Sequence, residues 1–487
     1  MQPARVTASQ ADASIGASEG AMSVATGDWM SILDEIGAHV PEHRILTDQD
    51  VMLGLSKDQG EGAAAGKPIA VVRAESTDEV AEVVRACIRH RVPVVARGAG
   101  TGLSGGANAI DGGIVIALDR MNQMLRIDPM ERLAVVQAGV VNDDLRRIVA
   151  EHGLWYPPDP ASSPWSTIGG NVATNAGGIC CVKYGVTRDY VLALEMVTGT
   201  GEIVRIGHRT AKGVAGYDLV GLVVGAEGTL GVVTEVTVRL RPLPPSARSI
   251  VGFFGSIIDA GNAVRAVADA GLTPSALELI DQHCLAAVDA WKNMGLSVEA
   301  EVILLGRVDD PGSTGDTQAA AMVECFTASG ATFAAASSDD AEAEAMFAAR
   351  RLAYPALERL GPVVTEDVCV PKAQVPEMLA RIEAAAARHG IKIANVAHAG
   401  DGNLHPLLVA QTGDDDERHR TELAFEEIIT DAIALGGTVT GEHGIGLLKR
   451  HGLSQELSPA VMEMHRAVKR ALDPHNILNP GKIFDAA

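Results

Sequence analysis

Short apolar runs alternate with helix-like patterns from residue 69 onward. PIAVVRA is typical of a buried strand, and the stretch Ser76–Glu79 that follows is a start signal for a helix that ends near Arg91. VPVVARG predicts a second strand, which runs into a glycine-rich loop. We therefore predict a β–α–β unit with its loop at the carboxyl end of a strand, where α/β sheets bind ligands.

The pattern of strands changes after residue 243. GIVIALD, AVVQAG and LGVVTEVTVRLRP predict strands, and ALEMVTGTGEIVRI predicts a hairpin that turns around Gly199–Gly201. The prolines of the stretch Pro242–Pro245 end the last of these strands. Beyond them, SIVGFFGS, ILLGRVD and ATFAAASS predict strands separated by Ala-rich helices over 257–270, 317–329 and 341–360.

These patterns predict an α+β protein in four parts. Residues 1–28, rich in Ala, Ser and Gly, are expected to form a disordered extension. Residues 29–243, which open with a short helix, form the first domain, and residues 244–435 form an α+β second domain. Residues 436–487 are a C-terminal segment with a glycine-rich loop, a helix through Ala471 and a proline-punctuated tail.

Composition narrows the possible partners. The net charge of −22 repels phosphate backbones and anionic lipid surfaces, so no nucleic-acid partner is expected. No stretch approaches the roughly 18 apolar residues of a membrane span, and the N-terminus lacks the apolar core of a secretory signal. The six cysteines show no CxxC spacing, which indicates a reduced, cytoplasmic protein without an iron–sulfur cluster of its own.

Three glycine-rich stretches are candidates for binding a cofactor. Arg97–Gly106 has five glycines in ten residues and follows a strand, so its backbone N–H groups can approach a phosphate; the alternative is a mobile loop. Residues 157–163 and 167–178 are small and polar, which suits a large planar ligand, with Thr174 and Asn175 as polar contacts; a surface loop is the alternative. Residues 225–233 form the third stretch, which taken alone is weak evidence for a cofactor site.

Two further motifs carry side chains that can bind a metal. Gly400–Asn403 has the composition of a hairpin turn, which would pair His398 directly with His405. Opposed residues share a face at about 5 Å, which suits two imidazoles on one metal, although a register change of one residue would separate them. In Thr438–Gly446, Glu442 is a possible third ligand and His443 a possible acid or base; a capped turn is the alternative.

Together these motifs resemble the vanillyl-alcohol-oxidase-type flavoproteins. VPVVARGAGTGLSGGA, GAEGTLGVVTEVTVRLRP, AHAGDGNLHPLL, GEHGIG and DPHNILNPGKIF are most similar to the D-2-hydroxy-acid dehydrogenase branch, which includes the glycolate oxidase FAD subunit and FAD-linked D-lactate dehydrogenases. The resemblance spans roughly Leu33 to Phe484. It implies a two-part FAD-binding domain over 29–243, a cap domain over 244–435, and a C-terminal segment that completes the flavin site.

The resemblance also implies roles for individual residues. His398, His405 and Glu442 would bind a divalent metal, zinc or manganese; His443 would be the catalytic base, and Arg350 would bind the substrate carboxylate. The first glycine loop would wrap the FAD pyrophosphate, and it lacks the histidine that bonds covalently to FAD in some relatives, so FAD is expected to be non-covalent. The expected FAD-binding residues are Arg97, Gly98, Ala99, Gly100, Thr101, Gly102, Ser104, Gly105, Pro158, Asp159, Gly169, Gly170, Asn175, Gly177, Gly178, Gly228, Gly231, Val232 and Asn479.

The implied function is oxidation of a small D-2-hydroxy monocarboxylate, glycolate or D-lactate, by hydride transfer to flavin N5. D-2-hydroxyglutarate dehydrogenase is an alternative. That relative holds the distal carboxylate of its substrate with a lysine, and the matching stretch here has Thr365 instead. Glu366 and Asp367 are expected to repel a second carboxylate. A catalytically silent flavin-binding subunit is another alternative. Expected partners are an electron acceptor (a quinone, a cytochrome or an iron–sulfur subunit), through which the protein could associate with the inner membrane, and a second copy in a homodimer.

Overall fold

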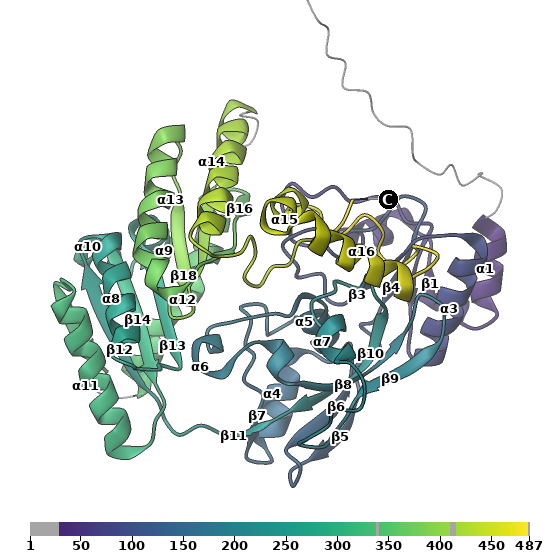
Figure 1. The fold of residues 1–487 in the computed structure, drawn as a ribbon, viewed down its shortest axis with the longest axis horizontal. Coiled ribbons are helices and arrows are strands. Elements are labelled where there is room, and N and C mark those ends of the chain that lie inside the picture. Colours follow the sequence, from purple (N-terminus) through teal and green to yellow (C-terminus); the bar gives the residue numbers. More distant parts are fainter. Residues whose placement is uncertain (1–28, 338–339, 410–414, 486–487) are drawn as a thin grey trace, which may run out of the picture.

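Three larger β-sheets and one two-stranded sheet form the framework of the protein, as a computed structural model shows for residues 29–337, 340–409 and 415–485 (Figure 1). The predicted extension over 1–28 lies outside the described residues. In Figure 1 the eight-stranded sheet and its helices lie on the left, and the two smaller sheets lie on the right and below. Within the described part, no helix is both long and apolar enough to cross a membrane.

The first sheet contains the predicted β–α–β unit. Its order is β1-β2-β4-β3, and β2, β4 and β3 are parallel. The side chain of Ser76 accepts a hydrogen bond from the Glu79 amide, which caps helix α3 as the sequence predicted. The elements are α1 (Trp29–Gly37), β1 (Ile45–Leu46), α2 (Gln49–Gly54), β2 (Ala70–Arg73), α3 (Thr77–His90), β3 (Val94–Arg97) and β4 (Ile114–Ala117).

The second sheet is antiparallel, in the order β5-β6-β10-β8-β9. The predicted hairpin pairs Val197 with Ile203 around the Gly199–Gly201 turn. Pro242 is still paired, in a two-residue ladder between β11 and β7, because a proline can take part at a sheet edge. The elements are β5 (Met124–Asp128), β6 (Leu133–Gln137), α4 (Asn142–Ala150), β7 (Leu154–Trp155), α5 (Ile168–Thr174), α6 (Cys181–Tyr184), β8 (Val191–Val197), β9 (Ile203–Gly207), α7 (Leu219–Val223), β10 (Val232–Arg239) and β11 (Arg241–Pro242).

The third sheet has eight strands, and helices cover both of its faces. Its order is β15-β12-β14-β13-β18-β19-β16, with β17 also on β19. One core packs α8, α11, α13 and α14 against one face, and another packs α9 and α12 against the other. The elements are β12 (Arg248–Phe254), α8 (Ile257–Asp269), β13 (Ala276–Asp281), α9 (Gln282–Lys292), α10 (Leu296–Glu299), β14 (Val302–Val308), α11 (Gly312–Ala328), β15 (Phe333–Ala336), α12 (Asp340–Glu358), β16 (Val363–Thr365), β17 (Val368–Cys369), α13 (Val375–His389), β18 (Ala394–His398), β19 (Asn403–Val409) and α14 (Asp415–Ala434).

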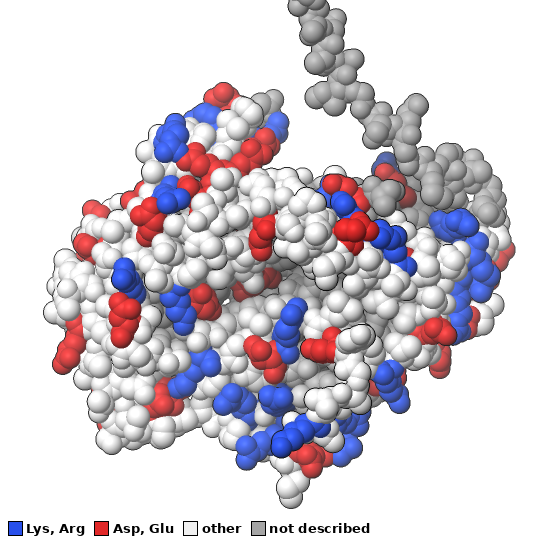
Figure 2. All heavy atoms as spheres, in the orientation of Figure 1, with Lys and Arg blue, Asp and Glu red and all other residues white. Residues whose placement is uncertain are grey.

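The C-terminal segment returns from the third sheet to the first. After α15 (Arg450–Glu456) and α16 (Pro459–Leu472), the chain runs beside β3, where Val94 and Leu478 form a parallel bridge. The Val94 amide donates to the Ile477 carbonyl, and the Asn479 amide donates to the Val94 carbonyl, both at 2.7 Å. Figure 2 shows the visible face hollowed at its centre, between the part built on the eight-stranded sheet and the rest.

Candidate active site

The β18–β19 hairpin carries both predicted metal-binding histidines. Its register pairs His398 with Asn403 and Val396 with His405. The predicted direct pairing of His398 with His405 is therefore wrong. The difference is two residues, however, and side chains alternate with a period of two, so both imidazoles still lie on one face. Their ring centroids are 5.3 Å apart and the rings are perpendicular.

This face of the sheet is the one that α9 and α12 cover. Val396 on β18 and Leu407 on β19 point into the core under these helices, so His398 and His405, each two residues away, point to the same side. Helix α12 carries Arg350 to this side.

Glu442 reaches the two histidines from the C-terminal segment. An antiparallel bridge between Cys369 and Thr438 places this segment beside β17. The Oε1 atom of Glu442 lies 3.4 Å from Nε2 of His398 and 3.3 Å from Nε2 of His405. Candidate ligand atoms of all three residues lie within 4.8 Å of one another, so these residues fit a divalent metal.

Arg350 joins this cluster through a buried carboxylate that the sequence analysis missed. Glu278 on β13 accepts a hydrogen bond from Nε of Arg350 at 2.9 Å, and its Oε1 atom lies 2.9 Å from Nδ1 of His398. The side chain of Glu278 is 1 % exposed. Glu278 holds Nε of Arg350, and the two terminal nitrogens are the part of the guanidinium expected to meet a substrate carboxylate.

His443 lies beside His405, with the two rings stacked at 5.0 Å and 12° apart. Loss of hydration lowers the pKa of His443 to about 4, so its imidazole is neutral at neutral pH. Its Nδ1 atom has no hydrogen-bond partner among the described residues. A neutral ring with a buried nitrogen that lacks a partner can accept a proton from a group brought within hydrogen-bonding distance, which is the role expected for His443.

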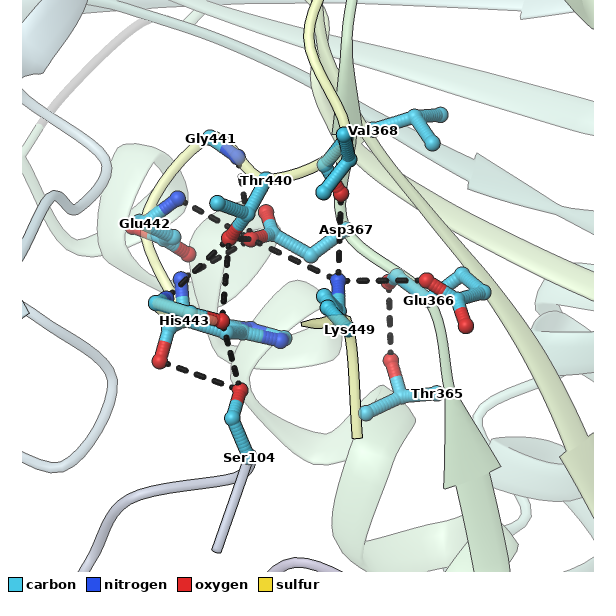
Figure 3. A network of polar contacts seen from close by, with 12 residues as sticks. Ser104, Thr365, Glu366, Asp367, Val368, Thr440, Gly441, Glu442, His443 and Lys449 are labelled. Carbon is cyan, nitrogen blue, oxygen red and sulfur yellow. Dashed lines mark hydrogen bonds and ion pairs between the residues drawn. The ribbon is translucent and has the colours of Figure 1, made fainter. Parts of the chain in front are cut away.

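The acidic pair after β16, Glu366 and Asp367, is bound by other parts of the chain. Asp367 is fully buried and accepts several hydrogen bonds from the loop that carries Glu442 and His443 (Figure 3). Glu366 lies 3.1 Å from the buried ammonium of Lys449. Both carboxylates are thus held by other parts of the chain, and their expected repulsion of a second substrate carboxylate stays a prediction.

The first glycine loop follows β3 and presents a buried guanidinium. Arg97 donates from Nη2 to the Lys57 carbonyl at 3.0 Å, while its buried Nε and Nη1 atoms have no partner among the described residues. Gly100 has a φ of +75°, and a Cβ there would lie 2.1 Å from the Arg97 side chain. Orphaned cationic donors beside a bare backbone fit the pyrophosphate of FAD. Gly98, Ala99, Thr101, Gly102 and Gly105 belong to the same loop.

Ser104 of the first glycine loop also contacts the C-terminal segment. Its hydroxyl donates to the Gly444 carbonyl at 2.8 Å, and its carbonyl accepts from the Leu447 amide at 2.7 Å. The first glycine loop is thereby tied to the loop of Glu442 and His443.

The second glycine-rich stretch forms α5 and the turn after it. Gly177 lies against Glu442, where a Cβ would approach the carboxylate oxygen to 2.4 Å. Gly178 similarly lies against the backbone of Asp159, whose side chain accepts from the Cys180 amide at 3.0 Å. Gly169 packs on Ala138, the residue directly after β6, so its small size serves helix packing. Gly170 is also in α5, Asn175 ends it in a left-handed conformation, and the Pro158 carbonyl accepts from Asn142.

The third stretch and the C-terminal tail meet at Glu227 and Asn479. The Asn479 side chain donates to the carbonyls of Gly106 and Glu227 at 2.9 and 2.8 Å. The Glu227 carboxylate accepts from the amides of Ile445 and Gly446 at 2.7 and 2.8 Å. Gly228, Gly231 and Val232 follow directly and lead into β10. Glu227 was not predicted as a site residue.

Two family models match the chain. "FAD binding domain" covers residues 68–207, and "FAD linked oxidases, C-terminal domain" covers residues 243–483. The chain belongs to the FAD-linked oxidase family. It is an FAD-dependent oxidoreductase.

Relatives along most of the chain support this assignment. The glycolate oxidase subunit GlcD of Bacillus subtilis is 43% identical over 86% of this chain and 89% of its own length. GlcD of Escherichia coli K12 is 38% identical over 93% of this chain and 91% of its own length. A D-lactate dehydrogenase of Anaerostipes hadrus is 35% identical over 90% and 94%.

Solved structures share the fold at low identity. p-Cresol methylhydroxylase with bound substrate has a TM-score of 0.81 at 18% identity and covers 95% of this chain and 98% of its own. A 4-ethylphenol oxidase from Gulosibacter chungangensis has a TM-score of 0.79 at 18% identity and covers 96% of this chain and 98% of its own. The fold is thus the two-part FAD-binding fold of the vanillyl-alcohol-oxidase type, as the sequence predicted.

Proposed function

We propose that the FAD-linked oxidase chain oxidises a small D-2-hydroxy monocarboxylate, glycolate or D-lactate, to the 2-oxo acid. The observation that carries the proposal is the convergence of His398, His405 and Glu442 beside a neutral base, His443, and a carboxylate-binding arginine, Arg350. The relatives named for glycolate and D-lactate support the same substrate class.

Substrate binding is assigned to Arg350. A guanidinium can hold a carboxylate through two parallel hydrogen bonds, which orients the acid in a plane. Glu278 occupies Nε at 2.9 Å and so restricts rotation of the group. The substrate is then held with its hydroxyl toward the histidine cluster.

Proton transfer is assigned to His443. Its pKa of about 4 keeps the ring neutral, and its stacking on His405 holds it beside the cluster. When bound, FAD supplies the acceptor for the hydride from Cα, and the divalent metal supplies a Lewis acid for the hydroxyl. His398, His405 and Glu442 would hold the metal, and the three glycine-rich stretches with Asn479 would hold FAD.

The residue at position 365, a threonine, favours a small substrate. Thr365 supplies no charge for a distal carboxylate, and Lys449, which lies 3.1 Å from the neighbouring Glu366, is buried. A dicarboxylate such as D-2-hydroxyglutarate would therefore find no cationic partner at position 365.

The experiment is anaerobic flavin bleaching by glycolate, D-lactate, L-lactate and D-2-hydroxyglutarate, before and after chelation. Bleaching by glycolate or D-lactate that chelation abolishes and zinc or manganese restores supports the proposal. Bleaching by D-2-hydroxyglutarate alone would show that this acid, and not glycolate or D-lactate, is the substrate. A yellow protein that none of these acids bleaches would indicate a catalytically silent flavin subunit.

We also propose an external electron acceptor: a quinone, a cytochrome or an iron–sulfur partner subunit. The six cysteines are all free, and none forms a cluster-binding group within the described residues. Two relatives are named as subunits, which supports an assembly with other chains. A cytoplasmic location with partner-mediated membrane association, and homodimer formation, remain part of this proposal.

A further inference from the structure

Asp367 lies in the short connection between β16 and β17, at the centre of a polar network (Figure 3). It is 0 % exposed. The sequence analysis assigned it no role as a ligand or a base, yet its carboxylate contacts three separate parts of the chain. These contacts link the eight-stranded sheet to the C-terminal segment.

One oxygen of Asp367 holds the loop that supplies the metal ligand and the base. Its Oδ2 atom accepts from the amides of Gly441, Glu442 and His443 at 3.0, 3.0 and 2.8 Å. It also accepts from the Thr440 hydroxyl at 2.6 Å. Three successive N–H groups that converge on one anion form a nest, which sets the peptide planes on both sides of Glu442.

The other oxygen faces the hairpin histidine. The Oδ1 atom accepts from the Asn403 side chain at 2.7 Å and lies 3.7 Å from Nδ1 of His405. That Nδ1 atom is buried and has no hydrogen-bond partner among the described residues. A histidine that binds a metal through Nε2 usually turns its Nδ1–H group toward a carboxylate or carbonyl, so Asp367 stands where such a partner is needed.

We propose that Asp367 is the positioning residue that aligns Glu442, His443 and His405 with one another. This inference rests on the proposed function, because it concerns the metal and base cluster of that site. One carboxylate fixes the backbone of Glu442 and His443 through Oδ2 and faces the ring of His405 through Oδ1. Glu278 has the matching position at His398, with its carboxylate 2.9 Å from Nδ1.

The chemistry of these neighbours requires a carboxylate. Every group within hydrogen-bonding distance of Asp367 in this network is a donor, and Lys449 adds positive charge at 3.9 Å from Oδ2. An amide in the same place keeps one acceptor oxygen, but its NH2 group must then point at other N–H groups. The loop would therefore move away from the position that brings Glu442 to the histidines.

The main test compares Asp367→Asn with wild type in the FAD-loaded, full-length protein. Apo-metal protein is titrated with zinc alone against a chromophoric chelator, and FAD absorbance and melting temperature are recorded. Asp367→Asn should bind zinc about 10–100-fold more weakly while it keeps its FAD. Asp473→Asn is the matched control, because Asp473 is also buried and accepts from two successive amides, at 3.2 and 2.8 Å, away from this cluster. It should melt earlier with zinc affinity within twofold of wild type.

A milder pair of variants covers the case in which Asp367→Asn does not fold. Thr440→Val removes one donor to Asp367, whereas Thr438→Val, two residues earlier, removes a hydrogen bond to Glu456 at 2.9 Å. Zinc affinity should fall several-fold for Thr440→Val and stay near wild type for Thr438→Val.

Zinc affinities within twofold of wild type for both Asp367→Asn and Thr440→Val would overturn the inference and leave Asp367 as an anchor of the fold. Equal losses for Thr440→Val and Thr438→Val would overturn it as well. A wild type that binds neither zinc nor manganese would overturn it together with the metal site. Because zinc binding is measured without substrate, failure to oxidise any hydroxy acid would refute the proposed function and leave this test intact.

Discussion

Glu278 and Arg350 form a buried ion pair, 2.9 Å from Oε2 to Nε, that lies on the same sheet face as the histidine cluster. Arg350 of this pair is expected to bind the substrate, and Glu278 is expected to hold the metal ligand His398. Substrate binding and metal binding are therefore expected to respond together when this one carboxylate is changed.

Glu278→Gln should lower both metal affinity and thermal stability. Gln cannot compensate the charge of Arg350, and breaking a buried pair costs about 3–5 kcal/mol. Loss of the carboxylate at His398 should weaken metal binding about tenfold. Zinc titration and thermal melting measure these effects. Asp281→Asn, which changes a buried helix cap on the same strand, should lower only the melting temperature; equal zinc affinity in both variants would contradict the prediction.

Arg350→Lys should lower kcat/KM at least about tenfold, because an ammonium cannot bind Glu278 and a substrate carboxylate with the same geometry, and a lost charged hydrogen bond is worth about 1.5–3 kcal/mol. Steady-state kinetics with the bleaching substrate measure this. Arg351→Lys, at the next and exposed position, is the control. A kcat/KM within twofold of wild type for Arg350→Lys would remove Arg350 from the site.

His405→Ala should lose the metal and keep FAD, because its imidazole faces Glu442 whereas the expected pyrophosphate loop lies on the first sheet. Flavin reduction should fall by orders of magnitude. Metal analysis and anaerobic reduction measure both effects, with His389→Ala, which removes a contact to Glu427, as the control. If His405→Ala only melts earlier, with normal metal content and reduction, the two histidines are core residues that flank a turn.

FAD should be released completely by acid, because no histidine occurs in the first glycine loop from residue 92 to 107. After precipitation with trichloroacetic acid, all of the yellow colour should appear in the supernatant. Colour that stays in the pellet after washing would show a covalent bond.

Glu227 should make the stability of the protein depend on pH. Burial raises its pKa from 4.5 to about 7. Between these two values the folded protein binds more protons than the unfolded chain, so this contribution to the free energy of unfolding is lost as pH rises toward 7. Glu227→Gln should remove the dependence, so the difference in melting temperature between the variant and wild type should shift in favour of the variant from pH 4.5 upward. A difference that is constant with pH would contradict this.

The sequence predicted what short-range patterns and motifs determine. Strand periodicity and the cap at Ser76 led to the first sheet, and the glycine motifs led to the family. The face shared by His398 and His405 was also correct, because a register error of two residues preserves the face. Their direct pairing was wrong because loop composition alone does not set which residue closes a hairpin.

The carboxylates that support the site were missed because their roles arise from tertiary contacts. Glu278 is an acid within the apolar strand ALELID, and this break in the pattern was a usable signal. Asp367 was expected, with Glu366, to repel a second substrate carboxylate, and it is the bridge between Cys369 and Thr438 that brings the donors of residues 440–443 to it. No local pattern contains that contact.

The bridge between Leu478 and Val94 has a consequence for synthesis on the ribosome. Strand β3 is the outer strand of the first sheet, and Val94 uses both its amide and its carbonyl to bind residues 477 and 479. Until these last residues leave the ribosome, the nascent chain carries an open strand edge, and an open edge can pair with another chain. Premature termination before residue 477 would therefore expose a site for aggregation as well as remove the tail.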